Sequence, residues 1–385
     1  GAITVRLWWM CCFVVQADDC RRVSLVTGVP ACALPFWALG AWLVDRLSGD
    51  GVGAVRLAAP VRPDGGYSGD TLILPAVIQK DGRETEERFV VRREPPEAAI
   101  YPAQSPTTAI EVELQWRVLR GLEDHSGIPV APSVGFEPDG RVLGGPFFVT
   151  GFVAGDIPRE DPAYVVEGFY AEATPQRRRA MNEAAVQTIA TVNRVDWMAA
   201  GLGHLVPEGC EPTNLRQLDL WEEFASGELR GRPHPILAEG WRRLRAEVPP
   251  DAAAALCWGD CRLGNIFWDG ATPVCTTDFE GATIAPAEFD LGWFLSFDRW
   301  IHEACGNPRL DGEPTREELV GVYERALGRR AVGVRWHEAF GAARYCTLVL
   351  RIMNRLEERG LLPPGSDLYL GGGVTDALRM QLEER

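Results

Sequence analysis

Trp258-Gly259-Asp260-Cys261-Arg262-Leu263-Gly264-Asn265, followed thirteen residues after the Asn by Asp278-Phe279-Glu280, is the stretch of this sequence that decides the fold. It brings two carboxylates and an amide close together in the chain. An Asp and an Asn five positions apart, with a second acidic residue after a short hairpin, is the spacing with which ATP-dependent phosphoryl transfer holds a substrate hydroxyl and Mg2+. The stretch therefore predicts Asp260, Asn265 and Asp278 as catalytic candidates.

The three side chains fit different tasks in such a reaction. Phosphoryl transfer requires the protein to align a hydroxyl, neutralise phosphate charge and exclude water. Asp260 can accept or orient the hydroxyl proton, while Asn265 and Asp278 supply oxygen ligands suited to Mg2+. An Asp-x-x-x-x-Asn pair alone is a weak signal, but Gly259, Gly264 and the downstream Asp-x-Glu strengthen it.

The composition is that of a globular protein large enough for two lobes. Its 385 residues include 39 basic and 54 acidic side chains, which give a net charge of −15. This balance argues against a nucleic-acid surface and mildly favours cationic or metal-bound partners, although solubility alone would also explain it. We expect no nucleic-acid partner.

The cysteines and the apolar segments of the sequence indicate the cellular compartment in which the protein works. The ten cysteines contain no C-x-x-C pair, which predicts reduced, mostly buried thiols in a cytoplasmic enzyme. Residues 5–17 resemble the apolar region of a signal peptide but are too short to span a bilayer. No later segment has the roughly 18 uninterrupted apolar residues of a membrane helix, so we expect no membrane partner and favour the cytoplasm over export.

The periodicity of apolar residues predicts an α+β fold of two lobes. Residues 1–35 lack a clear pattern and are treated as an amino-terminal extension of uncertain structure. Residues 36–153 are expected to form an N-lobe with helices at 36–47 and 107–122 and strands at 54–60, 71–79, 88–92, 131–136 and 146–153. Residues 154–385 are expected to form a C-lobe with helices at 176–195, 215–224, 241–248, 286–305, 316–327 and 336–359, interrupted by a hairpin of strands 266–268 and 273–277.

Together the motif and the lobes resemble the aminoglycoside phosphotransferase-like family, which shares the protein-kinase fold. That family's catalytic loop reads like His-Gly-Asp-x-x-x-x-Asn and its metal segment like Asp-Trp-Glu, followed by Pro and Asp-Leu-x-Trp. The matching positions here are Gly259, Asp260, Asn265, Asp278, Glu280, Pro286, Asp290, Leu291 and Trp293. The resemblance implies that Asp260 is the catalytic base, that Asn265 and Asp278 bind Mg2+ with help from Glu280, and that Asp290 supports the catalytic loop.

Three positions depart from the family pattern. Trp258 replaces the usual His, which mainly orients the loop, and we interpret Trp258 as a core aromatic on a buried loop. Arg92 aligns with the strand lysine that binds the α- and β-phosphates, a substitution that alters the local geometry; Arg93 is the fallback. Gln115 aligns with the helix glutamate that pairs with that cation.

The helix offers alternatives to Gln115. Glu111 or Glu113 serves if the register of the helix differs from the alignment, although glutamates on an exposed helix face are common. A solvated charge at the end of a strand is the corresponding alternative for Arg92.

Two further segments are candidates for binding the nucleotide. In the Gly-rich stretch 65–71, Gly65, Gly66 and Ser68 can bring backbone N–H groups to the phosphates, because glycine permits close approach. The main chain of Gly151 and Val153 is expected to hydrogen-bond adenine, as in the segment that joins the lobes of the family. An ordinary Gly-rich hairpin and an edge strand would look the same in sequence.

The function implied by the resemblance is a phosphotransferase that uses ATP and Mg2+ to phosphorylate a hydroxyl of a small molecule. The acceptor is either an aminoglycoside-like antibiotic or a hydroxylated metabolite such as a hydroxyacyl-CoA, and the choice between ATP and GTP stays open. The resemblance defines the donor side better than the acceptor side. The alternative, favoured by Trp258, Arg92 and Gln115, is a nucleotide-binding pseudokinase or regulatory module.

Overall fold

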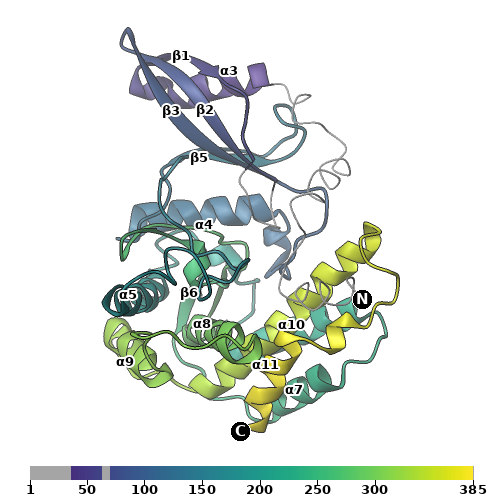
Figure 1. Ribbon diagram of the computed structural model, residues 1–385. Helices are drawn as coiled ribbons and strands as arrows, with labels where there is room; N and C mark the ends of the chain where they lie inside the picture. Colours follow the sequence, from purple (N-terminus) through teal and green to yellow (C-terminus); the bar gives the residue numbers. More distant parts are fainter. Residues whose placement is uncertain (1–35, 63–69, 385) are drawn as a thin grey trace, which may run out of the picture.

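The N-lobe is built on a curled antiparallel sheet (Figure 1). The computed structural model describes residues 36–62 and 70–384. The sheet has five strands in the order β1-β2-β3-β5-β4. Their bounds are β1 Val52–Leu57, β2 Asp70–Lys80, β3 Arg83–Arg93, β4 Ser133–Glu137 and β5 Phe147–Gly151. Asp81 and Gly82, both with positive φ (50° and 77°), close the β2–β3 hairpin, as expected for a two-residue turn that matches strand twist.

Helix α3 (Phe36–Leu47) covers this sheet beside β1 (Figure 1). Every second residue of β2 is buried, which is the period of a strand with one face in a core. Those side chains pack with α3 and β5 in a small hydrophobic core of their own, which includes Leu39, Leu43, Leu72, Leu74, Ile78, Val91, Phe147 and Val149.

The second and larger core lies among the helices of the C-lobe. The helices are α5 Pro175–Asn193, α6 Asn214–Leu229, α7 Pro235–Ala246, α8 Glu288–Arg299, α9 Arg316–Leu327, α10 Val334–Glu358 and α11 Gly373–Glu383, with a π-helical turn, η6, at Trp300–Ala304. Short 3-10 helices lie at Ser48–Asp50, Pro106–Thr108, Gly203–Leu205, Leu263–Asn265 and Leu368–Leu370. α10 runs beside α8 through the centre of this layer (Figure 1).

Helix α4 (Glu111–His125) connects the two parts. It lies between the sheet and the helices (Figure 1), and its apolar residues Leu114, Val118 and Leu122 belong to the larger core. Two short antiparallel pairs, β6 Ala254–Cys257 with β9 Thr283–Pro286 and β7 Ile266–Asp269 with β8 Thr272–Thr276, carry the candidate catalytic residues.

The α+β, two-lobe architecture predicted from the sequence is confirmed, and several boundaries are corrected. β3 begins at Arg83 rather than at residue 88, and α4 begins at Glu111 rather than at residue 107. The β6–β9 pair and α11 were not predicted. The extension at residues 1–35 lies outside the described residues.

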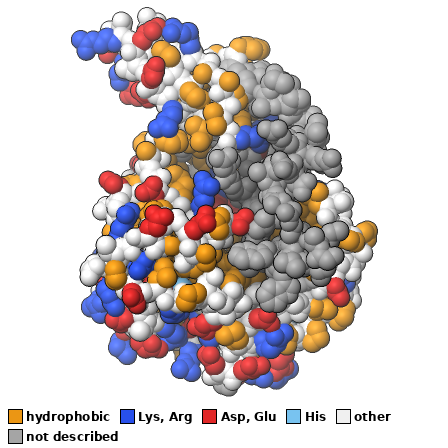
Figure 2. All heavy atoms as spheres, in the orientation of Figure 1, with side chains coloured by type: hydrophobic (Ala, Val, Ile, Leu, Met, Phe, Trp, Pro, Cys, Tyr) orange, Lys and Arg blue, Asp and Glu red, His pale blue; other side chains and the backbone are white. Residues whose placement is uncertain are grey.

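Figure 2 shows acidic and basic side chains interspersed over the helical part of one face, so the acidic excess is dispersed there. Among the cysteines within the described ranges, Cys210, Cys257, Cys261, Cys275 and Cys346 are free thiols. No helix in those ranges has the length and apolar character needed to cross a membrane.

Candidate active site

The loop after β6 can form only because Gly259 has no side chain. Gly259 adopts a positive φ of 86°, and a Cβ at this position would overlap the backbone of Gly281. Two segments far apart in sequence, the loop with Asp260 and the loop with Asp278, therefore touch at a pair of glycines. Their contact brings the candidate base and the candidate metal ligand together.

Asp260 is buried and held by several donors. Its Oδ2 accepts hydrogen bonds from Asn265 Nδ2 at 3.0 Å and from Arg262 Nε at 3.2 Å. Its Oδ1 accepts from the indole Nε1 of Trp293 at 3.0 Å. Burial raises the pKa of Asp260 to about 7, with a smaller contribution from the negative charge of Asp278. A fixed carboxylate with a pKa near neutrality is suited to accept a proton.

Asp290 holds the backbone of this loop. Its carboxylate accepts from the backbone N–H groups of Trp258 at 2.7 Å and Gly259 at 2.9 Å, and from Asn193 Nδ2 at 2.8 Å. Asp290 is fully buried at the start of α8. These hydrogen bonds fix the backbone of the candidate catalytic loop, which is the supporting role that the resemblance implied for Asp290.

Arg344 on α10 supports the same loop from behind and was not found in the sequence. Its Nη2 donates to the carbonyl oxygen of Gly259 at 2.8 Å. Its guanidinium lies 3.5 Å from the ring centroid of Phe289 and 4.7 Å from that of Trp293. Burial lowers the pKa of Arg344 to about 10, so it stays charged at neutral pH. A single arginine in an otherwise apolar stretch of helix gives no sequence signal for this role.

Trp258 is a buried core aromatic, as interpreted from the sequence. Its ring packs against Phe279, with the centroids 5.5 Å apart. In addition, its Nε1 donates to the carbonyl oxygens of Thr277 at 2.9 Å and Asp278 at 3.1 Å. The residue in place of the family's His therefore ties the catalytic loop to the Asp278 segment.

Arg92 points from β3 into the same centre. Its Nη2 lies 2.8 Å from Asp278 Oδ1 and 3.9 Å from Glu280 Oε2. Its side chain is only 15% exposed, which rules out the alternative of a solvated charge at a strand end. Arg93, the fallback, instead pairs with Asp70 and donates to the carbonyl oxygen of Leu143.

Glu111, one of the two alternatives to Gln115, is the helix carboxylate that lies near Arg92. Glu111 is buried, and its carboxyl group interacts with that of Glu280. Gln115, one turn later, donates its Nε2 to Glu111 at 3.2 Å. Glu113 points away and pairs with Arg117 on the surface. Burial raises the pKa of Glu111 to about 7.

The donor set for a cation consists of amide and carboxylate oxygens. Asn265 uses its Nδ2 to donate to the carbonyl and carboxylate oxygens of Asp260 at 2.8 and 3.0 Å, so its Oδ1 is the atom that can face a cation. Asp278 has a positive φ of 65°, an uncommon backbone state for a non-glycine residue that clusters at functional sites. Glu280 lies near Glu111 and Arg92. Its role as a metal ligand stays a prediction. Within the described ranges, no three or more His, Cys, Asp or Glu residues gather as a metal site.

The predicted nucleotide contacts are placed only in part. Gly65, Gly66 and Ser68 lie outside the described residues. Gly151 ends β5, and its N–H donates to the carbonyl oxygen of Pro132 at 2.8 Å. The N–H of Gly151 is therefore engaged, and its contact with adenine stays a prediction. The amide of Val153, two residues later, stays a prediction.

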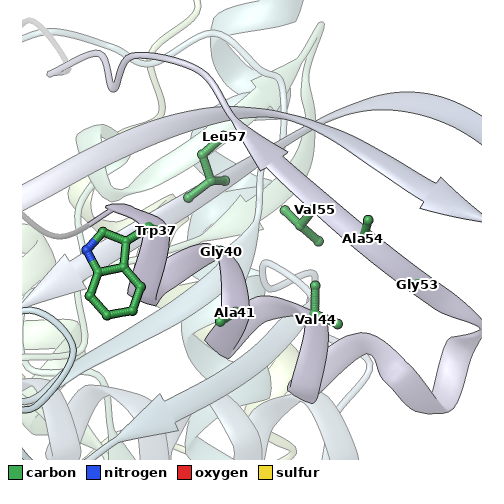
Figure 3. Close-up of a pocket in the computed structure, with 8 residues that line it drawn as sticks. All are labelled: Trp37, Gly40, Ala41, Val44, Gly53, Ala54, Val55 and Leu57. Carbon is green, nitrogen blue, oxygen red and sulfur yellow. The ribbon is translucent and has the colours of Figure 1, made fainter.

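A hollow on the outer side of the N-lobe is separate from this centre. It lies between α3 and β1, has a volume of about 400 Å³ and is lined by apolar residues that include Trp37, Val44 and Leu57 (Figure 3). None of its lining residues belongs to the site described above. Its position argues against a part in the chemistry.

The arrangement of Asp260, Asn265 and Asp278 agrees with a match to a known family. The model of the phosphotransferase enzyme family matches residues 76–322, which is more than half of the chain. The chain belongs to the phosphotransferase enzyme family. Membership in this family makes the protein a kinase-like transferase.

Comparisons with individual proteins agree on the fold. A protein described as a "putative aminoglycoside phosphotransferase" from Ralstonia eutropha has 20% identity and a TM-score of 0.65, over 90% of this chain and 96% of that one. The GDP complex of aminoglycoside 2'-phosphotransferase-IIIa has 14% identity and a TM-score of 0.50, over 89% and 96% of the two chains. Among curated proteins, the probable acyl-CoA dehydrogenase IBR3 of Arabidopsis thaliana is 26% identical over 65% of this chain. The match covers 29% of that relative, so the chain spans about a third of the length of such relatives.

Proposed function

We propose that this phosphotransferase is an ATP- and Mg2+-dependent enzyme that transfers a phosphoryl group to a hydroxyl of a small molecule, with Asp260 as the base. The observation that carries the proposal is the Asp260 carboxylate, fixed by Asn265 and Trp293 and held by burial at a pKa of about 7. A base with this pKa can take a hydroxyl proton at neutral pH.

The residues around Asp260 suit the remaining tasks. Asn265 Oδ1 and the Asp278 carboxylate would hold Mg2+ with help from Glu280, and the bound cation would neutralise phosphate charge. In this proposal the guanidinium of Arg92 binds phosphate oxygens of the nucleotide. Arg92 also pairs with Asp278. When the nucleotide and Mg2+ bind, we therefore expect Arg92 to contact the phosphate oxygens and Asp278 to contact the cation.

Two candidates remain for the phosphoryl donor and two for the acceptor. We infer ATP as the donor, although one structural relative binds GDP, which makes GTP the alternative. The acceptor candidates are an aminoglycoside-like antibiotic, as in the names of the structural relatives, and a hydroxyacyl-CoA, because the curated relatives are named acyl-CoA dehydrogenases. The free thiols support action in a reducing compartment such as the cytoplasm.

The experiment is a screen for nucleotide consumption across aminoglycosides, macrolides and hydroxyacyl-CoAs, with ATP or GTP and with or without Mg2+. For the acceptor so identified, Asp260→Asn should bind Mg–ATP as the native chain does but lose turnover by at least about 100-fold, the scale of a lost general base. Unchanged turnover in Asp260→Asn would exclude Asp260 as the base.

The second candidate function is a nucleotide-binding module without turnover. The observation in its favour is the 2.8 Å ion pair between Arg92 and Asp278, which engages the proposed metal ligand. Tight binding of Mg–ATP with no phosphate transfer to any acceptor class in the screen would select this function.

A further inference from the structure

A buried arginine with unused hydrogen-bond donors lies on α10. Arg355 is only 8% exposed. Within the part of the chain that the structure describes, its Nε and Nη2 have no hydrogen-bond partner. A buried cation without a full set of partners is costly to fold. Such a group is a candidate for binding a ligand from outside the chain.

The arginines one turn before and after Arg355 have partners. Arg351 pairs with Glu228 at 2.9 Å, and Arg359 pairs with Glu97 at 2.6 Å. This row of three arginines, Arg351, Arg355 and Arg359, thus has a carboxylate partner for each of its outer members, whereas Glu97 and Glu111 act on Arg355 only through their charge. Burial, and after it the charge of Arg351, lower the pKa of Arg355. Within the described residues, Arg355 therefore has no carboxylate with which it forms an ion pair.

This row is connected to the catalytic centre by one short segment of chain. Arg351 donates to the carbonyl oxygens of Ala98 and Ala99 in the connection between β3 and α4. Two residues further along, the ring of Tyr101 lies against Gly281, next to the Asp278 segment. The charge of Glu111 also acts on Arg355. The row therefore borders the region of the proposed chemistry.

The geometry of α10 gives the distance between Arg355 and the loop that carries Asp260. Arg344, which supports the loop of Asp260, and Arg355 are both on α10, eleven residues apart. With a rise of 1.5 Å per residue, they are separated by about 16 Å along the helix axis. A molecule that reaches from Arg355 to Asp260 must therefore be extended.

We propose that Arg355 anchors an oxyanion subsite for the acceptor, so that the acceptor carries a phosphate or carboxylate at one end and the reactive hydroxyl at the other. The unpaired Nε and Nη2 lie on the same edge of the guanidinium, and such a pair of N–H groups binds two oxygens of a phosphate or carboxylate in parallel. This proposal rests on the proposed function and defines its acceptor as anionic. A polycationic acceptor would be repelled at this position.

The test measures binding without turnover. The nucleotide site is filled with Mg–AMPPNP, and phosphate or succinate is titrated at constant ionic strength into wild type, Arg355→Met, Arg355→Lys and Arg330→Met. Arg330 is the matched control because its side chain is 92% exposed. At least one anion should bind wild type and Arg330→Met equally, with at least about 10-fold weaker binding to Arg355→Met, the scale of a charge-assisted hydrogen bond. Arg355→Lys should be intermediate, because it keeps the charge but loses the paired donors.

Thermal unfolding separates this function from a structural one. Without anion, Arg355→Met should have a Tm no lower than wild type, because it removes a buried charge without partners. The anion that binds should raise the Tm of wild type but not of Arg355→Met. A large fall in Tm, no binding of either anion to wild type, or equal binding to Arg355→Met would overturn the proposal. A chain that binds an anion through Arg355 but transfers phosphate to no acceptor would refute only the proposed function.

Discussion

The indole of Trp293 shows how a single hydrogen-bond donor can orient the carboxylate of Asp260, the proposed base. Trp293 matches the family motif, yet the motif alone does not say what its ring does. In the structure its Nε1 bonds Asp260 Oδ1 at 3.0 Å, while its ring packs on the guanidinium of Arg344. The same side chain therefore orients the carboxylate of Asp260, the proposed base, and connects it to the guanidinium of Arg344 behind the loop.

Replacing Trp293 by Phe should separate these two roles. The Phe ring keeps the packing, but Asp260 loses one donor, and we expect kcat to fall by about 10-fold with little change in nucleotide KM. Trp336→Phe is the matched control, because Trp336 is also buried and its Nε1 donates to a backbone carbonyl, that of Leu244, at 2.8 Å. Equal losses of kcat in the two variants would show that a buried indole donor matters only for the fold.

The candidate catalytic residues could be found because their spacing in the sequence is local, whereas the residues that support them lie far away in the chain. Asp260, Asn265 and Asp278 come together through a short loop and one hairpin, and the structure gathers them as their spacing indicated. Arg344 acts on that loop from a helix about 85 residues later in the chain. Nothing in the order of residues indicates that this arginine is buried under Gly259 rather than exposed on its helix.

At the scale of the element, α4 shows why Glu111 was not chosen over Gln115. The two residues are one turn apart, so either fits the alignment, and the choice depends on where the helix begins. The structure begins it at Glu111, because Ser105 and Thr108 close a separate 3-10 turn in which the Ser105 N–H donates to Thr108 Oγ1 at 3.0 Å. Sequence periodicity does not resolve such a boundary.

Glu94 anchors that boundary. It directly follows β3, and its two carboxylate oxygens accept from the N–H groups of Glu111 at 3.1 Å and Val112 at 2.9 Å. These N–H groups have no partner within the helix, and a negative charge at this end is favourable. Glu94 thus joins the end of the strand that carries Arg92 to the start of the helix that carries Glu111.

Replacing Glu94 by Ala should loosen this junction. The free energy of unfolding should fall by about 1 kcal/mol, the scale of a lost helix cap, and nucleotide affinity should weaken because Glu111 is no longer held near Arg92. Urea unfolding and nucleotide titration measure the two effects. Glu113→Ala is the control, because Glu113 is in the same turn of α4 but forms a surface pair with Arg117 that should contribute little. A Glu94 variant that behaves like the Glu113 variant would show that the junction does not depend on this carboxylate.

The strands that were predicted too short or not predicted at all were missed for the same physical reason, which is that they lack an alternation of buried and exposed residues. The first half of β3, Arg83–Arg88, is exposed at every position, so it lacks the alternation by which a strand is recognised in sequence. It is ordered by pairing with β2 from Lys80 to Pro75. β6 and β9 are buried along most of their short lengths and likewise show no alternation.

At the scale of the whole molecule, the packing of α8 against α10 buries a histidine that affects stability. Gly292 on α8 lies so close to α10 that a Cβ would overlap the backbone of His337. His337 is 2% exposed, and burial lowers its pKa to about 4. The charged groups that act on it are Glu288, which favours the protonated form, and Arg344, which opposes it.

This histidine should make the fold sensitive to mild acid. Above pH 6.5 it is neutral in both states and costs nothing. Between about pH 6.5 and pH 4 the unfolded chain binds a proton that the folded chain excludes, so stability falls as pH falls. From pH 7.5 to pH 5 the loss from this one group is about 2 kcal/mol.

His337→Gln should therefore lose about 2 kcal/mol less than wild type between pH 7.5 and pH 5, as measured by urea unfolding at the two values. At pH 7.5 the variant should be less stable than wild type, because an amide replaces a ring in a packed core. His125→Gln is the control, because it makes the same substitution at a histidine that is exposed at the end of α4. If the loss between pH 7.5 and pH 5 is the same in wild type and His337→Gln, then His337 takes up its proton equally in both states, and the acid sensitivity of the fold must come from other groups.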